Sequence, residues 1–174
     1  MSNDGHFERV VLPHLDAGYT LARYLTRDAS EAEDAMQDAI LRAVRYSHTL
    51  RSDADARAWL LAIVRRECYG GRQAQLETVA FDDVPELSLV DPREQPDVLA
   101  GRSLVEHRLR EAVAALPDVL RETLVLRELQ QCSYNEIATI TDVPLGTVMS
   151  RLSRARAQLA TQLRGLAAFE EEYG

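Results

Sequence analysis

The chain lacks several features that would assign it to a common functional class. It contains no lysine, so all 20 of its basic residues are arginines. No run of eighteen apolar residues and no basic-then-apolar leader occurs, so we expect no membrane insertion and no signal peptide. The only two cysteines, Cys68 and Cys132, have no CxxC or Cys/His spacing, which favours buried free thiols over a zinc site. There is no glycine-rich phosphate loop, nucleophile motif or paired His/Asp/Glu spacing, so we expect no catalytic residue, metal or cofactor.

Charge is distributed unevenly along the chain. The net charge is −8 over 174 residues, a length that suffices for one domain or two small ones. Residues 71–100 hold 2 basic and 7 acidic side chains and three of the six prolines, which predicts an acidic linker. Residues 1–70 and 101–174 are nearly neutral. A near-neutral C-terminal part should bind DNA only weakly alone, which implies help from a larger partner.

Residues 132–159 form the most informative segment, because their pattern predicts a helix-turn-helix. Ser133 precedes a short apolar-periodic run and Glu136 follows three residues later, a pairing typical of a capping box. The buried side of this helix would consist of Ile137, Ala138 and Ile140. The break falls before Pro144, because the residue ahead of a proline avoids helical geometry and proline suits a first helical turn.

The second helix of this motif has two faces. Its apolar positions recur at intervals of four, three and four residues, which predicts a stripe that faces a core: Val148, Leu152, Ala155 and Leu159. The other side carries Thr147, Ser150, Arg151, Arg154 and Gln158, with Arg156 at its flank. Small residues near a helix start with arginines behind them suit a DNA major groove. The alternative is an ordinary solvated, charged face.

The first 70 residues predict three main helices, over roughly 14–25, from Ser30 with a capping box to Glu33, and over roughly 55–69. The buried stripe of the second would comprise Ala32, Ala35, Met36, Ala39, Ile40, Ala43 and Val44. Its opposite face would comprise Asp34, Gln37, Asp38, Leu41, Arg42 and Arg45. Leu41 is therefore either a lone exposed leucine or part of a surface that docks on a partner.

The remaining helices follow from shorter patterns. In the third helix we expect buried Leu60, Ile63 and Val64, and a basic edge of Arg57, Arg65, Arg66 and Arg72. Trp59 belongs either to the core or to a stacking platform. In the C-terminal part, residues 105–116 predict one helix, and a second starts at 116–118 with apolar positions Leu120, Leu124, Val125 and Leu129. Both would pack behind the helix-turn-helix.

Three segments of the chain match a known pattern: AEDAMQDAILRAVR, RAWLLAIVRRECY, and the stretch from ALPDVLRE through GTVMSRLSRARAQL. Together they resemble the extracytoplasmic-function sigma factors of bacterial RNA polymerase. The first is similar to conserved region 2.2, the second to regions 2.3 to 2.4, and the third to region 4. The resemblance covers essentially the whole chain in the right order. It implies an all-α fold of two small helical domains, 1–70 and 101–174, joined by a flexible acidic linker at 71–100.

The resemblance also implies a function and a set of sites. The protein would be a cytoplasmic sigma factor that binds core RNA polymerase and promoter DNA and is controlled by an anti-sigma factor. Polymerase binding would fall to Asp34, Gln37, Asp38, Leu41 and Arg42. Recognition of the −10 element would involve the loop 47–55, in particular Ser52 and Asp53, together with Arg65 and Arg66. Recognition of the −35 element would involve Thr147, Ser150, Arg151, Arg154 and Arg156.

One departure from the family pattern concerns the −10 element. After the WLLAIVR segment the family usually has an asparagine and, four residues on, an aspartate, where this chain has Arg66 and Gly70. We therefore expect an unusual −10 preference, and Gly70-Gly71 should end the helix early.

Two other functions stay open on the sequence. One is a stand-alone helix-turn-helix regulator whose residues 1–70 form a sensor or dimerisation domain. The other is an interaction protein that sequesters a sigma or anti-sigma factor without binding DNA. A regulator would bind duplex DNA alone, whereas a sigma factor would need core polymerase.

Overall fold

The described part of the chain is built from helices. The computed structural model describes the backbone of residues 3–70 and 104–173 and the side chains of residues 5–70 and 106–165. The N-terminal lobe contains α1 (Asn3–Val11), α2 (Leu15–Thr26), α3 (Ala29–Arg45) and α4 (Ala56–Tyr69), with 3-10 turns at Leu12–His14, Ser47–Thr49 and Asp53–Asp55. The C-terminal lobe contains α6 (Leu104–Ala114), α7 (Asp118–Glu128), α8 (Tyr134–Thr141) and α9 (Leu145–Tyr173). The all-α expectation is confirmed; the segment expected as a linker, 71–100, lies outside the described residues.

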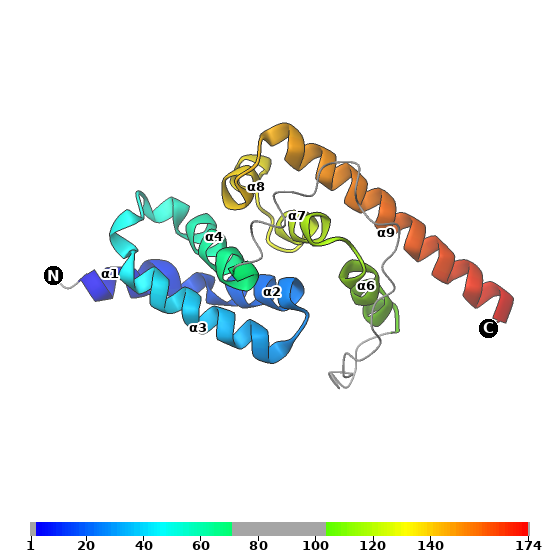
Figure 1. Cartoon of the computed structure of the whole chain (residues 1–174), viewed down its shortest axis with the longest axis horizontal. Helices are drawn as coiled ribbons and strands as arrows, with labels where there is room; N and C mark the ends of the chain where they lie inside the picture. The colour runs from blue at the N-terminus through cyan, green and yellow to red at the C-terminus, as the bar shows by residue number, and fades with distance from the viewer. Residues whose placement is uncertain (1–2, 71–103, 174) are drawn as a thin grey trace.

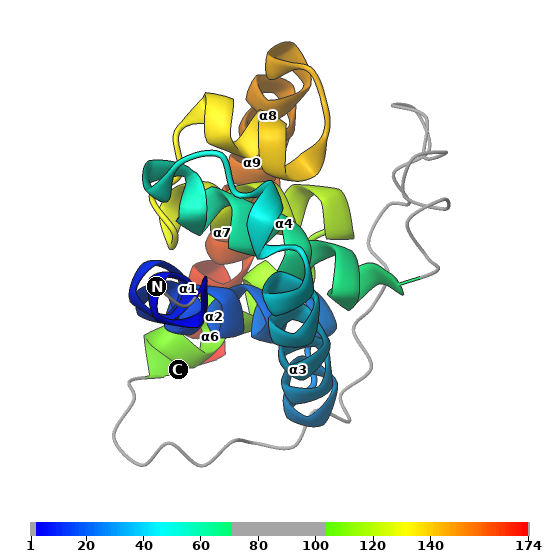
Figure 2. The same cartoon turned by 90° about the vertical axis from the view of Figure 1, so that its left-hand side faces the viewer.

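The two lobes pack against each other (Figure 1). α4 lies against α8 and α2 lies against α7, so α3 is on the side of its lobe that faces away from α8 and α9, as Figure 2 also shows. The buried apolar residues of both lobes belong to one continuous core, with Leu61 and Val64 from α4 and Leu120 and Ile137 from the C-terminal lobe. The lobes therefore meet through an apolar contact as well as through the polar contacts described below.

The start of α3 differs from the sequence expectation. Its N-cap residue is Asp28, whose carboxylate accepts a hydrogen bond from the backbone N–H of Glu31 at 2.9 Å. Aspartate and serine cap helices about equally well, and Asp28 comes two residues before Ser30. The helix therefore begins at Ala29, and the expected capping box from Ser30 to Glu33 is wrong.

The buried stripe of α3 is narrower than expected. Ala32, Ala35, Met36, Ala39 and Ala43 are buried, as the sequence predicted, but Ile40 is half-buried and Val44 is 52% exposed. At about 100° per residue, Val44 lies roughly 120° around the helix from Ala32, beyond the reach of the core. Four of the five buried positions are alanines, whose small side chains allow α3 to pack closely against α2 and α4.

The other helix boundaries are close to those expected. α4 ends at Tyr69 because Gly70 adopts a φ of 48°, a conformation that favours glycine. This confirms that Gly70 ends the helix. Leu60 and Val64 are fully buried, Ile63 is partly buried, and Trp59 packs against the core from its edge. The additional helix α1 was not among the sequence expectations.

Candidate nucleic-acid interface

The helix-turn-helix of α8 and α9 is held by the capping box that the sequence predicted. The Ser133 hydroxyl accepts a hydrogen bond from the N–H of Glu136 at 3.1 Å, and the Glu136 carboxylate accepts one from the N–H of Ser133 at 2.7 Å. α8 ends at Thr141, and the next residue, Asp142, has a φ of 54° and turns the chain toward Pro144. The capping box thus fixes the start of α8, and the turn at Asp142 separates α8 from α9.

The inner stripe of α9 is confirmed. Val148, Leu152 and Ala155 are at most 1% exposed, and Leu159 packs against the same core. On the opposite side Arg154 is exposed and Ser150 is half-buried, with its hydroxyl bonded to the carbonyl of Thr147 at 3.1 Å. Gly146, at the start of the helix, has open space around it, so a DNA backbone would meet no side chain there.

Arg151 does not lie on this outer face, which corrects the sequence interpretation. Its side chain is only 17% exposed, and its Nη1 lies 3.8 Å from Oε1 of the fully buried Glu122 on α7. Helix geometry gives the reason, because Arg151 is only about 60° from Val148, at the flank of the stripe. Ser150, by contrast, lies about 160° from Val148.

The same helix geometry places two further residues of α9 at the surface, and the sequence pattern had not singled them out. Met149 is 53% exposed, and Ser153 is exposed beside Arg154. Ser153 lies about 140° around the helix from Val148, so careful helix arithmetic would have found it. Met149 offers an apolar surface of the kind that contacts a thymine methyl group.

Arg156 lies at the flank of α9, as expected. Its guanidinium donates to Oε1 of Glu128 at 2.7 and 3.3 Å, and both side chains are about half exposed. The hydrogen bonds that Arg156 donates to Glu128 raise the pKa of Arg156, so this side chain stays cationic. An exposed pair of this kind is weak, and a DNA phosphate can replace Glu128.

The loop 47–55 lies beside α4 and is held there by side-chain contacts. Trp59 anchors it by donating its Nε1–H to Oγ1 of Thr49 at 3.2 Å. The exposed Ser52 caps the turn by accepting a hydrogen bond from the N–H of Ala54 at 3.2 Å. Asp53 is 63% exposed and lies 3.0 Å from Nε2 of His6 on α1. The loop is thus positioned by α1 and α4, while its tip faces solvent.

The two arginines expected to serve the −10 element have different surroundings. Arg66 is exposed. Arg65 is 9% exposed at its side chain, and its guanidinium forms a two-pronged ion pair with Glu122 of the other lobe, from Nε to Oε2 at 2.7 Å and from Nη2 to Oε1 at 3.2 Å. Its guanidinium also stacks on Tyr69, 5.2 Å from the ring centroid. The structure therefore places only Arg66 at the surface.

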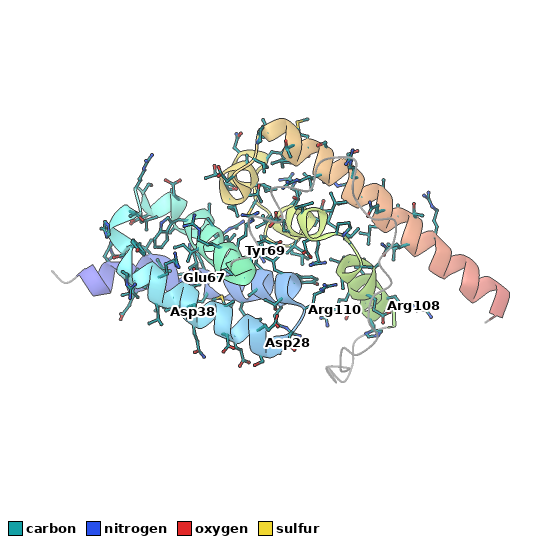
Figure 3. The ribbon with its side chains drawn as sticks, in the orientation of Figure 1. Asp28, Asp38, Glu67, Tyr69, Arg108 and Arg110 are labelled. Carbon is teal, nitrogen blue, oxygen red and sulfur yellow. The ribbon has the colours of Figure 1, made fainter. Side chains whose placement is uncertain are left out.

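A second face is formed by the outer side of α3. Asp34, Gln37, Asp38, Leu41 and Arg42 are all exposed, and Leu41 reaches 67%. Arg42 forms an ion pair with Glu67 of α4, in which Nε of Arg42 lies 2.6 Å from Oε1 of Glu67. Figure 3 labels Asp38 on α3 and Tyr69 near the end of α4, which contacts the C-terminal lobe through α8. The expected polymerase-binding residues thus share one surface, turned away from the C-terminal lobe.

In the part of the chain that the structure describes, no group of three or more His, Cys, Asp or Glu side chains gathers in a way that suits a metal ion. Within the same residues, no helix combines the length and the apolar character that crossing a membrane requires.

Comparisons with known proteins agree with this geometry. Residues 10–75 match Sigma-70 region 2, and residues 106–159 match Sigma-70 region 4. The chain is 31% identical over 169 residues to the RNA polymerase sigma-H factor of Pseudomonas aeruginosa, covering 92% of this chain and 87% of that one. It is 32% identical over 160 residues to the ECF RNA polymerase sigma-E factor of Escherichia coli K12, covering 84% and 80%.

A solved structure is similar over nearly the whole chain. It is the sigma factor RpoE of Bartonella quintana in complex with the anti-sigma factor NepR, with 26% identity and a TM-score of 0.67. The match covers 91% of this chain and 97% of that one. The two matched regions occur in the same order as in sigma factors, the second contains the helix-turn-helix, and the similarities extend over most of the chain. The chain therefore belongs to the extracytoplasmic-function sigma factors of bacterial RNA polymerase.

Proposed function

We propose that this chain is an alternative sigma factor that binds core RNA polymerase in the cytoplasm and directs it to promoters, with no enzymatic activity of its own. The observation that carries this proposal is the outer face of α3, where Leu41 is 67% exposed among polar residues. Among the described residues Leu41 is the most exposed large apolar side chain, and Val44 of the same helix is 52% exposed, so α3 presents apolar surface that suits a partner. This face is turned away from α8 and α9, so polymerase and the −35 element would be bound on different sides.

The DNA contacts follow from the two sites described above. For the −35 element we propose Thr147, Ser150 and Arg154 on α9, with Met149 and Ser153 added and Arg156 contacting a phosphate. Arg151 is not included, because its side chain faces Glu122 inside the C-terminal lobe. For the −10 element we propose Ser52 and Asp53 of the loop 47–55, together with Arg66. Arg65 would join them once it is released from Glu122.

Control by an anti-sigma factor is part of this proposal. The solved relative from Bartonella quintana is bound to the anti-sigma factor NepR and matches this chain over both lobes. An inhibitor that covers the outer face of α3 would block polymerase binding directly.

The test is a binding measurement with a fluorescent form of the full chain. We expect tight binding to core polymerase and only weak, strongly salt-dependent binding to duplex promoter DNA without polymerase. Tight and sequence-specific binding to duplex DNA in the absence of polymerase, without binding to core polymerase, would favour a stand-alone regulator and contradict the proposal.

A further inference from the structure

The contact between the two lobes centres on one carboxylate. Glu122 on α7 is fully buried and is approached by two guanidiniums, from Arg65 on α4 and from Arg151 on α9. The Arg65 contact crosses between the lobes, whereas the Arg151 contact lies within the C-terminal lobe. Tyr69 of α4 closes the site, and burial together with the charge of Glu122 raises the pKa of its hydroxyl.

The two arginines differ in how they contact the Glu122 carboxylate. Arg65 makes two hydrogen bonds to Glu122, at 2.7 and 3.2 Å. Arg151 approaches only to 3.8 Å, beyond hydrogen-bonding distance, and its buried Nη1 has no hydrogen-bond partner. Burial lowers the pKa of Arg151; the charge of Glu122 raises this pKa, and the charge of Arg65 lowers it. A buried guanidinium nitrogen that makes no hydrogen bond destabilises the arrangement in which the lobes are closed.

The rest of the interface holds the lobes in register. Arg57 of α4 donates to the carbonyl of Gln130, and its Nη2 lies 3.3 Å from Sγ of Cys132. Arg27, after α2, donates to the carbonyl of Ala114 at 3.3 Å. Residues 120–126 of α7 are all buried, because α2 of the N-terminal lobe packs against α7 and Arg65 of α4 reaches Glu122.

We propose that Glu122 is a shared carboxylate that exchanges partners as the lobes separate, pairing with Arg65 in the closed form and with Arg151 in the open form. Opening then frees Arg65, which binds a phosphate with the same two-pronged geometry that it uses on a carboxylate. On opening, the loss of the Arg65–Glu122 ion pair is offset by the gain of the Arg151–Glu122 ion pair. The free-energy cost of separating the lobes is therefore reduced. The closed form leaves the outer face of α3 exposed, so polymerase can bind before the lobes separate. This DNA role of Arg65 rests on the function proposed above, whereas the exchange itself does not.

The experiment measures the distance between the lobes in the free protein. Glu33→Cys on α3 and Ala160→Cys on α9 place labels at exposed positions of the full chain. The native thiols react slowly by comparison, because Cys132 is buried and burial raises the pKa of Cys68 to about 12. Neither polymerase nor DNA is present, so the result does not depend on whether the proposed function is correct.

Partner exchange predicts opposite effects for the two arginines. Arg65→Gln should raise the ratio of open to closed molecules by roughly tenfold or more, because it removes the partner that Glu122 has only in the closed form. Arg151→Gln should lower this ratio, because Glu122 would lose its partner in the open form. Arg65→Lys keeps the positive charge but cannot form the two-pronged hydrogen bond. It should therefore also raise the ratio of open to closed molecules, but by a smaller factor than Arg65→Gln. It serves as the second variant if Arg65→Gln fails to fold.

The matched control is Glu128→Gln. Glu128 lies on the same helix as Glu122 but pairs with Arg156 within the C-terminal lobe, at the surface. We expect its distance distribution to equal that of the parent protein. Unchanged distances in both Arg65 variants would overturn the proposal, and so would opening by Arg151→Gln, which would make Arg151 a purely structural residue.

Discussion

Replacement of Leu41 by glutamate tests the polymerase-binding face most sharply. Leu41 is 67% exposed on α3, so its side chain makes few contacts in the free protein. Complete burial of a leucine side chain is worth about 1.5–3 kcal/mol, and the exposed two thirds correspond to about 1–2 kcal/mol. A carboxylate forced into the same contact adds a desolvation cost, so we expect a total loss near 3 kcal/mol, or about a hundredfold in Kd.

The stability of the free protein should hardly change. Leucine and glutamate have similar helix propensities, and substitutions at exposed positions usually alter the free energy of unfolding by less than about 0.5 kcal/mol. The assay is fluorescence titration with core polymerase, beside a thermal melt followed by circular dichroism. Leu12→Glu is the control, because Leu12 is a leucine of the same lobe that is 49% exposed and lies outside the proposed face. A Kd for Leu41→Glu within twofold of the parent value would refute the assignment.

Three further predictions concern α9 and Cys68. Arg154→Ala should reduce promoter use by a factor matching about 1–3 kcal/mol and relax the preference at one position, whereas Arg156→Ala should weaken binding evenly across a promoter library. Leu152→Ala should act through folding, lowering the free energy of unfolding by about 2–5 kcal/mol, because Leu152 is 1% exposed; an unchanged melt with lost recognition would contradict this. Burial raises the pKa of Cys68 from 9.0 to about 12, so the folded state keeps the thiol neutral where the unfolded chain ionises it. Its contribution to stability is therefore complete below about pH 9 and is lost as the pH rises toward 12, which chemical denaturation between pH 8 and 11 measures against Cys68→Ala.

Local sequence signals predicted much of the fold. The capping box of Ser133 and Glu136 and the stripe of Val148, Leu152 and Ala155 are both present in the structure. They could be predicted because each depends on residues less than two turns apart. At the start of α3 the same capping logic selected the wrong residue, because Asp28 and Ser30 are both good caps and the pattern alone does not rank them.

The candidate site was predictable only where helix geometry decides exposure. Arg154 and Leu41 lie far from their buried stripes and are exposed, as expected. Arg65 and Arg151 border their stripes, and their surroundings depend on Glu122, which lies 57 residues from Arg65 in the sequence. A pairing between lobes leaves no local periodicity, so the sequence predicted an exposed basic edge where the structure has a buried ion pair.

The most direct test of the function is transcription in vitro from a promoter library with core polymerase and this protein. We expect transcripts that depend on the added protein and start downstream of a shared pair of −35 and −10 sequences. Arg154→Ala should reduce them, and Leu41→Glu should nearly abolish them. Transcripts that are the same with and without the protein, while the protein remains folded, would contradict its role as a sigma factor.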